Sequence, residues 1–223
     1  MSGVTYALGR SLYVALTNRC NSVSLISSRG PGFTLPPGSG FVPLADEFEP
    51  CADEVYRAVV SASSRLDGAH GAFESVVFAG AGEPLLRLRT LEEAARLIDA
   101  DGIAPLRVNT NGLVAGSSAE DVAARLRDAR VGAASVALMT ADPEQEAPPS
   151  EYNELMRPER LRLSPAFSLP LGHSDVCRFV RACIAVGISV ECTAVASPGV
   201  DLSAARACAT RLGATFRTRS WHP

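Results

Sequence analysis

Apolar residues recur along the chain in two alternating patterns. Short runs rich in β-branched residues predict strands, and longer stretches with an apolar residue every third or fourth position predict helices. The predicted strands are 11–17, 75–80, 106–112, 133–139, 188–196 and 214–219. The predicted helices are 52–66, 90–102, 118–132, 173–187 and 202–213. Thr90, Ser118 and Ser174 are typical helix starts, and Gly102, Gly132, Gly187 and Gly213 are typical helix ends.

Strands joined by helices predict a parallel sheet, because each helical crossover returns the chain to the same direction. Six such units fall short of the eight of a closed (β/α)8 barrel. We therefore predict an α/β fold, a partial (β/α)6 barrel with a parallel six-stranded sheet, as a single domain over residues 1–223. A flat doubly wound sheet is the alternative. In both folds ligands bind at the carboxyl ends of the strands.

Two segments interrupt this alternation. Residues 28–50 are rich in Gly and Pro and are too long for an ordinary connection, so we expect them to cover the strand ends. Residues 140–170 form a second excursion from the same end of the sheet. Long loops on the ligand face more often carry function than fill space.

Composition excludes several classes of protein. The chain has 47% hydrophobic residues and a formal net charge of -3, and its arginines are interspersed with acids, so no basic stripe indicates nucleic acid. No apolar run reaches the roughly 20 residues of a membrane span. The start "MSGVTYALGR" lacks signal-peptide features, so we expect a cytoplasmic protein.

The six cysteines include no CxxC pair, and in a reducing cytosol they do not form a disulfide framework. We expect Cys177, Cys183, Cys192 and Cys208 to be small buried hydrophobic residues. The histidines are expected on surface turns or the tail: His70, His173 and His222.

Two strand-end loops carry candidate binding residues. "GAGEPLL" (80–86) combines glycines that would let a ligand approach the backbone with Glu83, an acceptor for an ammonium group. In "NTNG", Asn109 and Asn111 point to one side of an extended chain. The alternative for both loops is an ordinary turn between a strand and a helix.

Taken in order, several segments resemble the radical S-adenosylmethionine proteins, most closely their small TatD-associated group. The resemblance is carried by "YALGRSLYVALTNRCN", "SVVFAGAGEPLLRL", "RVNTNGL", the segment from "ASVALM" to "YNELMRP", and "TAVASPGVDLSAARACATRLGATFRTR". It covers almost the whole chain and implies the partial barrel.

In that family the loop after the first strand carries a CxxxCxxC motif that holds a [4Fe-4S] cluster. The aligned positions here are Cys20, Ser24 and Ser27. Cluster iron is bound by thiolates, and serine hydroxyls are poor substitutes, so no iron–sulfur cluster and no metal is expected. Cys51 could in principle supply another thiol. Cys20 itself is either a nucleophile or a buried inert thiol, and no histidine lies near it in sequence.

The resemblance further implies S-adenosylmethionine as cofactor. Gly80, Gly82 and Glu83 align with the motif that contacts its amino group, and Asn109, Asn111 and Ser135 would line the rest of the pocket. The planar guanidinium group of Arg29, in "SSRGPGF", could donate hydrogen bonds to the carboxylate. The alternative is that this loop is an ordinary turn. Tyr152 and Arg157 match a sequence block of the family whose role is unknown. The alternative is a structural role, in which Arg157 is bonded to backbone carbonyls. Neither Glu83 nor Arg29 is expected to be core.

Three functions are compatible with these residues. The first is an enzyme that uses the sulfonium in polar transfer, cyclisation or elimination, acting on a small molecule, with Tyr152 or Asp142 as base. The second is a non-catalytic binding or regulatory module. The third keeps radical chemistry with an unconventional metal site. The open barrel edge would suit a homodimer; no nucleic-acid or membrane partner is expected.

Overall fold

A seven-stranded sheet forms the centre of the molecule, with the strands in sequence order. The computed structural model describes residues 3–22, 24–64, 72–114, 116–138 and 172–223. Strands β2 to β7 are parallel, as predicted, and β1 is antiparallel to β2. The strands are β1 Thr5–Leu8, β2 Ser11–Val14, β3 Ser75–Phe78, β4 Leu106–Thr110, β5 Val131–Ala137, β6 Ser189–Val195 and β7 Thr215–Arg219.

The first strand is the main difference from the predicted fold. β1 and β2 form a hairpin with a two-residue turn at Gly9 and Arg10, since Leu8 pairs with Ser11. A glycine between two alternating runs is a hairpin signal, and it was missed because the first run has only four residues. The hairpin gives the sheet an antiparallel edge.

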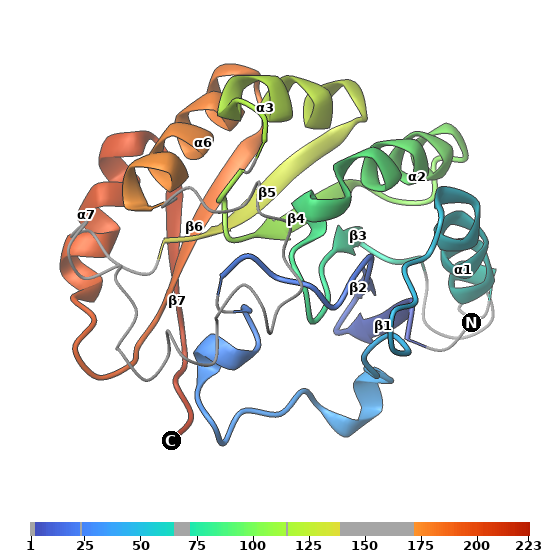
Figure 1. Cartoon of the computed structure of the whole chain (residues 1–223), viewed down its shortest axis with the longest axis horizontal. Helices are drawn as coiled ribbons and strands as arrows, with labels where there is room; N and C mark the ends of the chain where they lie inside the picture. The colour runs from blue at the N-terminus through green and yellow to red at the C-terminus, as the bar shows by residue number, and fades with distance from the viewer. Residues whose placement is uncertain (1–2, 23, 65–71, 115, 139–171) are drawn as a thin grey trace.

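The described residues form five α-helices, and Figure 1 shows them covering one face of the sheet. They are α1 Ala52–Ser64, α2 Leu88–Ala100, α3 Ala119–Asp128, α6 His173–Ala185 and α7 Leu202–Leu212. Ser118 caps α3 as predicted, and Gly213 ends α7 in the left-handed conformation. This arrangement of sequential parallel strands with helices outside fits the predicted partial barrel.

Other helix boundaries differ from the sequence prediction. A short 3-10 helix, η3 Pro84–Arg87, leads into α2, which therefore begins before Thr90. Gly172 rather than Ser174 precedes α6, and its amide donates to the Asp175 carboxylate over 3.0 Å. Helix α3 ends at Asp128, and Arg130 rather than Gly132 takes a positive φ, of 66°.

The hydrophobic core lies between the helices and the sheet. Large side chains that are fully buried include Phe78, Leu91, Leu126 and Phe179. Burying apolar surface in this layer drives the assembly, at roughly 25 cal/mol per Å². No helix in the described parts of the chain is both long and apolar enough to cross a membrane.

The side of the sheet opposite these five helices is accompanied by the segment that follows β2. This segment contains two 3-10 helices, η1 Ser27–Arg29 and η2 Pro37–Ser39, and runs below the strands in Figure 1. Leu44 is buried and its backbone exchanges two hydrogen bonds with the Asn18 side chain. Phe41 meets the Tyr6 ring edge-on, with centroids 4.9 Å apart. The Gly- and Pro-rich segment is therefore anchored by specific contacts.

Candidate functional site

The loops after β2 and β3 lie in direct contact at the carboxyl ends of the strands. The Gly82 amide donates to the Thr17 carbonyl over 3.2 Å. A Cβ on Gly82 would come within 2.3 Å of the Arg19 carbonyl oxygen, and one on Gly80 within 2.7 Å of the Ala15 Cβ. The two glycines thus permit close packing of one loop on the other, whatever they contribute to a ligand.

Glu83 joins the ends of β3 and β4. Its Oε1 accepts hydrogen bonds from the Thr110 hydroxyl at 2.7 Å and the Leu85 amide at 3.0 Å, and its Oε2 accepts one from the Asn111 amide at 2.8 Å. The residue is only 3% exposed, so the expectation that Glu83 lies outside the core is wrong. Burial raises the pKa of Glu83 to about 7, against the three donors, which lower it.

Cys20 lies beside this carboxylate. The Asn111 side-chain nitrogen is 3.8 Å from the Cys20 sulfur and donates to the Asn21 side-chain oxygen over 2.8 Å. Burial raises the pKa of Cys20 to about 12, and the charge of Glu83 adds to this effect. The sulfur is therefore a protonated thiol at neutral pH, and the prediction that it is buried is confirmed. Cys20, Glu83, Thr110 and Asn111 are called the strand-end rim below.

The two serines at the aligned cluster positions bind each other. The Ser24 hydroxyl donates to the Ser27 hydroxyl over 2.9 Å and accepts from the Ser27 amide over 3.1 Å. Cys51 is exposed at the start of α1, where its amide is bonded to the Glu54 carboxylate. A [4Fe-4S] cluster is held by thiolates. One protonated thiol and two mutually bonded hydroxyls do not fit it.

A second polar group lies on the face of the sheet opposite the five described α-helices. Asn109, Ser135 and Glu191 are neighbours in register across β4, β5 and β6. Arg107 donates to Asn109 over 3.2 Å and to Glu191 over 3.0 Å, and Arg217 donates to Glu191 over 2.7 Å. Burial would raise the pKa of Glu191, but the bonds and charges of Arg217 and Arg107 outweigh it and lower the pKa.

Arg219, on the same face, has a guanidinium nitrogen that donates no hydrogen bond to a described residue. Its Nη2 lies 3.4 Å from the Ser135 hydroxyl, while its Nε is buried and has no hydrogen-bond partner among the described residues. Burial, together with the charges of Arg217 and Arg29, lowers the pKa of Arg219 to about 10. Arg107, Arg217, Arg219 and Glu191 are called the arginine cluster below. A single carboxylate among three guanidinium groups leaves this face suited to an anion.

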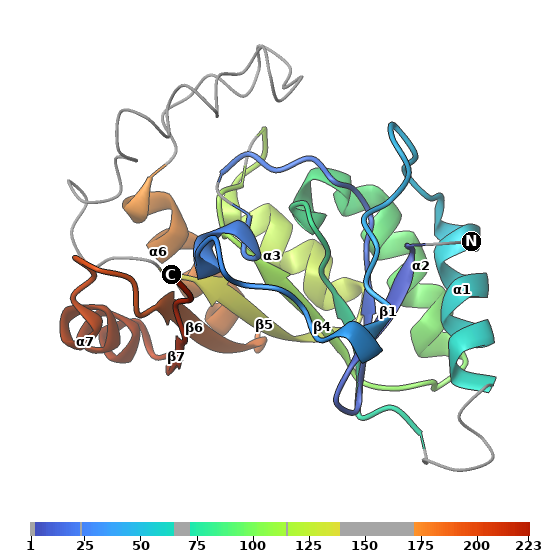
Figure 2. The ribbon, with the colours of Figure 1, turned by 90° about the horizontal axis from the view of Figure 1, so that it is seen from below.

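Arg29 holds the carboxyl-terminal tail, residues 220–223. Its Nε donates to the Ser220 carbonyl over 2.6 Å, its carbonyl accepts from the His222 amide over 2.7 Å, and its guanidinium lies 4.3 Å from the Phe33 ring centroid. A Cβ on Gly30 would lie 2.0 Å from the His222 carbonyl oxygen. Figure 2 shows the tail beside η1. The Arg-Gly loop that the sequence assigned to a ligand is thus at least partly engaged by the tail.

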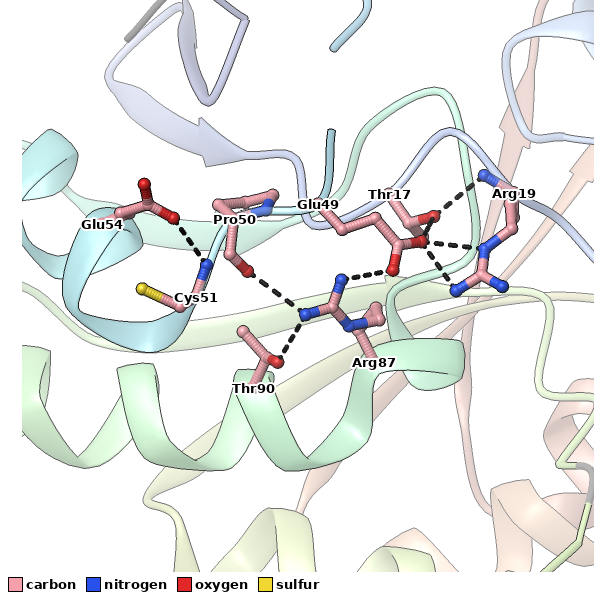
Figure 3. Close-up of polar contacts among 8 residues, drawn as sticks. All are labelled: Thr17, Arg19, Glu49, Pro50, Cys51, Glu54, Arg87 and Thr90. Carbon is pink, nitrogen blue, oxygen red and sulfur yellow. Dashed lines mark hydrogen bonds and ion pairs between the residues drawn. The ribbon is translucent and has the colours of Figure 1, made fainter. Parts of the chain in front are cut away.

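Glu49 fastens the end of the long segment to the strand-end loops, as Figure 3 shows. Its Oε1 accepts from the Thr17 hydroxyl at 2.7 Å and from the Arg19 Nε at 2.8 Å, and its Oε2 accepts from the Arg87 Nη1 at 2.5 Å. Burial would raise the pKa of Glu49, but these three partners outweigh it. No pattern in the sequence singled out Glu49, because its partners come from two segments distant in sequence, the loop after β2 and η3.

The predicted site residues therefore fall into two neighbouring groups. Gly80, Gly82, Glu83 and Asn111 build the strand-end rim and its support, whereas Asn109, Ser135 and Arg29 lie around the arginine cluster. Sequence reasoning missed Arg217 and Arg219, although their alternation in "ATFRTR" places both on one side of β7. Asp142, Tyr152 and Arg157 lie outside the described residues.

Comparisons with known proteins support the architecture. No protein-family model and no curated protein matches the chain. Among solved structures, Streptococcus suis SuiB bound to S-adenosylmethionine has a TM-score of 0.61 at 14% identity, covering 96% of this chain and 40% of that one. The TsrM methyltransferase of Kitasatospora setae, with cobalamin and a [4Fe-4S] cluster bound, has a TM-score of 0.55 at 16% identity, covering 92% and 36%.

The fold resembles that of SuiB and of the radical S-adenosylmethionine methyltransferase TsrM. At 14–16% identity the likeness shows the fold alone, and the chain spans about 40% of the length of SuiB. The same SuiB has also been solved with its precursor peptide SuiA, at a TM-score of 0.60. The predicted α/β partial barrel is thereby confirmed.

Proposed function

We propose that this protein binds S-adenosylmethionine at the carboxyl ends of its strands and uses it without an iron–sulfur cluster. The proposal rests on one observation: a radical S-adenosylmethionine fold in which the loop after β2 offers one buried thiol with a raised pKa and two hydroxyls bonded to each other. The fold keeps the polar residues at its ligand-binding edge, and the donor set for iron is absent from the predicted positions.

The residues fit the methionine end of this ligand in one specific respect. A carboxylate requires donors, and Arg219 presents a buried Nε without a partner beside the Ser135 hydroxyl. Asn109 lies next to Ser135 in register, and Arg29 adds positive charge nearby. The carboxylate would therefore bind over Ser135 and Arg219, with Asn109 completing the pocket.

Glu83 takes a positioning role in this scheme. Its two oxygens already accept three hydrogen bonds from its own chain, which hold the ends of β3 and β4 together. Asn111 is positioned by one of these hydrogen bonds, and Gly80 and Gly82 by the packing of their loop on the loop after β2. Glu83 would act on the ligand amino group through its negative charge at the pocket wall.

When bound, S-adenosylmethionine supplies an electrophilic sulfonium whose neighbouring carbons accept a nucleophile without an electron donor. The protein would orient the reacting groups and exclude water. The proposed base is Tyr152 or Asp142, and the proposed substrate is a small molecule. The TatD association, the cytoplasmic location and a homodimer remain part of this proposal.

Titration calorimetry with S-adenosylmethionine tests binding. The variants are Ser135→Ala and Arg219→Gln, and Arg10→Gln is the control because Arg10 is exposed at the β1–β2 turn in an ion pair with Glu74. We expect Arg219→Gln to weaken binding by about 1.5–3 kcal/mol, the range for a hydrogen bond to a charged group. No binding by the wild type at millimolar ligand would overturn the proposal.

Iron and sulfide analysis after anaerobic reconstitution tests the missing cluster. We expect substoichiometric iron and a colourless protein. About four irons per chain would instead favour radical chemistry with an unconventional metal site.

A non-catalytic binding or regulatory module is the second candidate. It is favoured by the internal bonding of the strand-end rim, where both Glu83 and Cys20 are buried and contact groups of the same chain. Product analysis distinguishes the two candidates: an S-adenosylmethionine-binding protein that never consumes its ligand is a module.

A further inference from the structure

A group of metal-binding side chains lies between α6 and α7, away from the strand-end rim. It consists of His173 and Cys177 of α6 and Cys208 of α7, and their ligand atoms all lie within 4.8 Å of one another. Cys177 and Cys208 are buried, and His173 is partly exposed. None of the three belongs to the predicted cluster motif or to the proposed S-adenosylmethionine pocket.

Helix geometry explains how these residues meet. His173 and Cys177 are four residues apart, so they lie on the same face of α6. Cys208 projects from α7, which packs beside α6 in the outer layer. The imidazole Nε2 lies 3.6 Å from the Cys177 sulfur and 3.9 Å from the Cys208 sulfur.

These separations match a tetrahedral zinc site. With Zn–S bonds of about 2.3 Å and Zn–N bonds of about 2.1 Å, a nitrogen and a sulfur ligand lie about 3.6 Å apart. Two sulfurs and one imidazole form a soft donor set that selects Zn²⁺ over Mg²⁺ or Ca²⁺. A cation placed among the three atoms would reach normal bond lengths with small movements of the side chains.

An ion has a route to this position. The three residues line a cavity of about 300 Å³, together with Ser174, Arg181 and Arg211. Because two thiolates neutralise Zn²⁺, the two arginines would leave the surroundings of the bound ion positive. The fourth coordination position would therefore face a cavity suited to water or to a small anion.

We propose that His173, Cys177 and Cys208 bind one Zn²⁺ ion, with the fourth position open to the arginine-lined cavity. Binding forms two Zn–S bonds and one Zn–N bond, and the two thiol protons leave to solvent. Affinity should consequently rise with pH. The site shares no residue with the proposed S-adenosylmethionine pocket, so the two proposals stand or fall separately.

The test uses the full chain, stripped with chelator and kept reduced, titrated with Zn²⁺ in competition with a chromophoric chelator. We expect one Zn²⁺ per chain, and about a hundredfold weaker binding in His173→Ala, Cys177→Ala and Cys208→Ala. Cys183→Ala is the matched control, because Cys183 is a buried cysteine of the same helix that is absent from the group. It should bind as the wild type does.

Co²⁺ provides a readout of geometry. Co²⁺ bound to the wild type should show thiolate-to-cobalt charge-transfer bands and the intense visible bands of tetrahedral coordination, and Cys177→Ala should lose them. Circular dichroism of the metal-free variants checks that they fold. Absence of binding at micromolar Zn²⁺, equal loss in the Cys183 control, or a disulfide between Cys177 and Cys208 that forms in preference to the metal site would overturn the proposal.

Discussion

The loop after β2 and the α6–α7 helix pair differ in how well the sequence of each indicates its ability to bind a metal. The loop resembles a metal-binding motif in sequence, yet it offers one buried thiol and two serine hydroxyls bonded to each other. The helix pair has no recognisable motif, yet it brings two sulfurs and an imidazole within 4.8 Å. Ligands that come from one loop show a recognisable spacing in the sequence, whereas ligands drawn from two helices meet only in the folded chain.

The same comparison separates residues that stabilise the fold from residues that are available to bind a ligand. The polar groups of the strand-end rim are already hydrogen-bonded within the chain, so their removal should destabilise the fold. Around α6 and α7 the corresponding groups surround a cavity, so their removal should change the response to metal and leave the metal-free fold largely intact. Four measurements test this contrast.

The largest effect is expected for Glu83→Ala. Three donors, from Leu85, Thr110 and Asn111, would lose their acceptor. Leaving a buried donor without a partner costs about 1–3 kcal/mol, so we expect the free energy of unfolding to fall by about 3 kcal/mol or more in urea denaturation. Glu93→Ala is the control, because Glu93 forms an exposed pair with Arg89. A loss below about 1 kcal/mol would contradict the structural role of Glu83.

The next largest effect is the stabilisation by zinc. At a free Zn²⁺ concentration one hundred times the dissociation constant, binding to the native state alone adds about 2.7 kcal/mol. Thermal unfolding with and without Zn²⁺ should show this increase for the wild type and for Cys20→Ala, but not for Cys177→Ala. If the stabilisation by Zn²⁺ disappears in Cys20→Ala, the metal binds at the strand-end rim and the proposed site is wrong.

The pH dependence of stability is the third test. The native pKa of Glu83 is raised from 4.5 to about 7, so between these values the native state holds a proton that the unfolded chain has released. Stability from this group is full below pH 4.5 and declines as pH rises to 7, by at most about 3 kcal/mol at about 1.4 kcal/mol per pKa unit. Glu83→Gln should remove this decline relative to the wild type. An unchanged slope in that variant would show that Glu83 is ionised throughout the window.

The smallest effect is expected at Ser24 and Ser27, the positions that align with the cluster motif. Ser24 is partly exposed and Ser27 exposed, and they contact each other through a short local bond. Ser24→Ala and Ser27→Ala should each change stability by less than about 0.5 kcal/mol and leave the iron content unchanged. A large loss of S-adenosylmethionine affinity in either variant would show that the hydroxyls bind the ligand directly.

Local patterns sufficed for most of the fold. Hydrophobic periodicity identified β2 to β7 and the five described α-helices, and capping residues such as Ser118 and Gly213 marked ends correctly. The parallel order followed from alternation of strand and helix. The β1 strand was missed because a four-residue run carries too weak a signal without its partner.

The site was predictable only in part. The loops that hold Glu83, Asn109 and Asn111 follow strands, so the sequence could place them at one edge of the sheet. It could not show that Glu83 would be bonded to Thr110 and Asn111, since that depends on how two loops pack. The chain's residue order likewise gave no sign that Arg29 meets the tail 191 positions away.

Periodicity and residue type are local properties, so the class of fold and the two serines at positions aligned with the cluster motif could be recognised from the sequence. Which polar groups are hydrogen-bonded within the chain, and which lack a described partner, depends on the tertiary structure. Glu83 and Arg219 are both charged and both follow a simple pattern, yet one is bonded to its own chain and the other keeps a buried Nε without a described partner. Hydrogen bonding and burial depend on atoms distant in sequence, and only folding brings those atoms together.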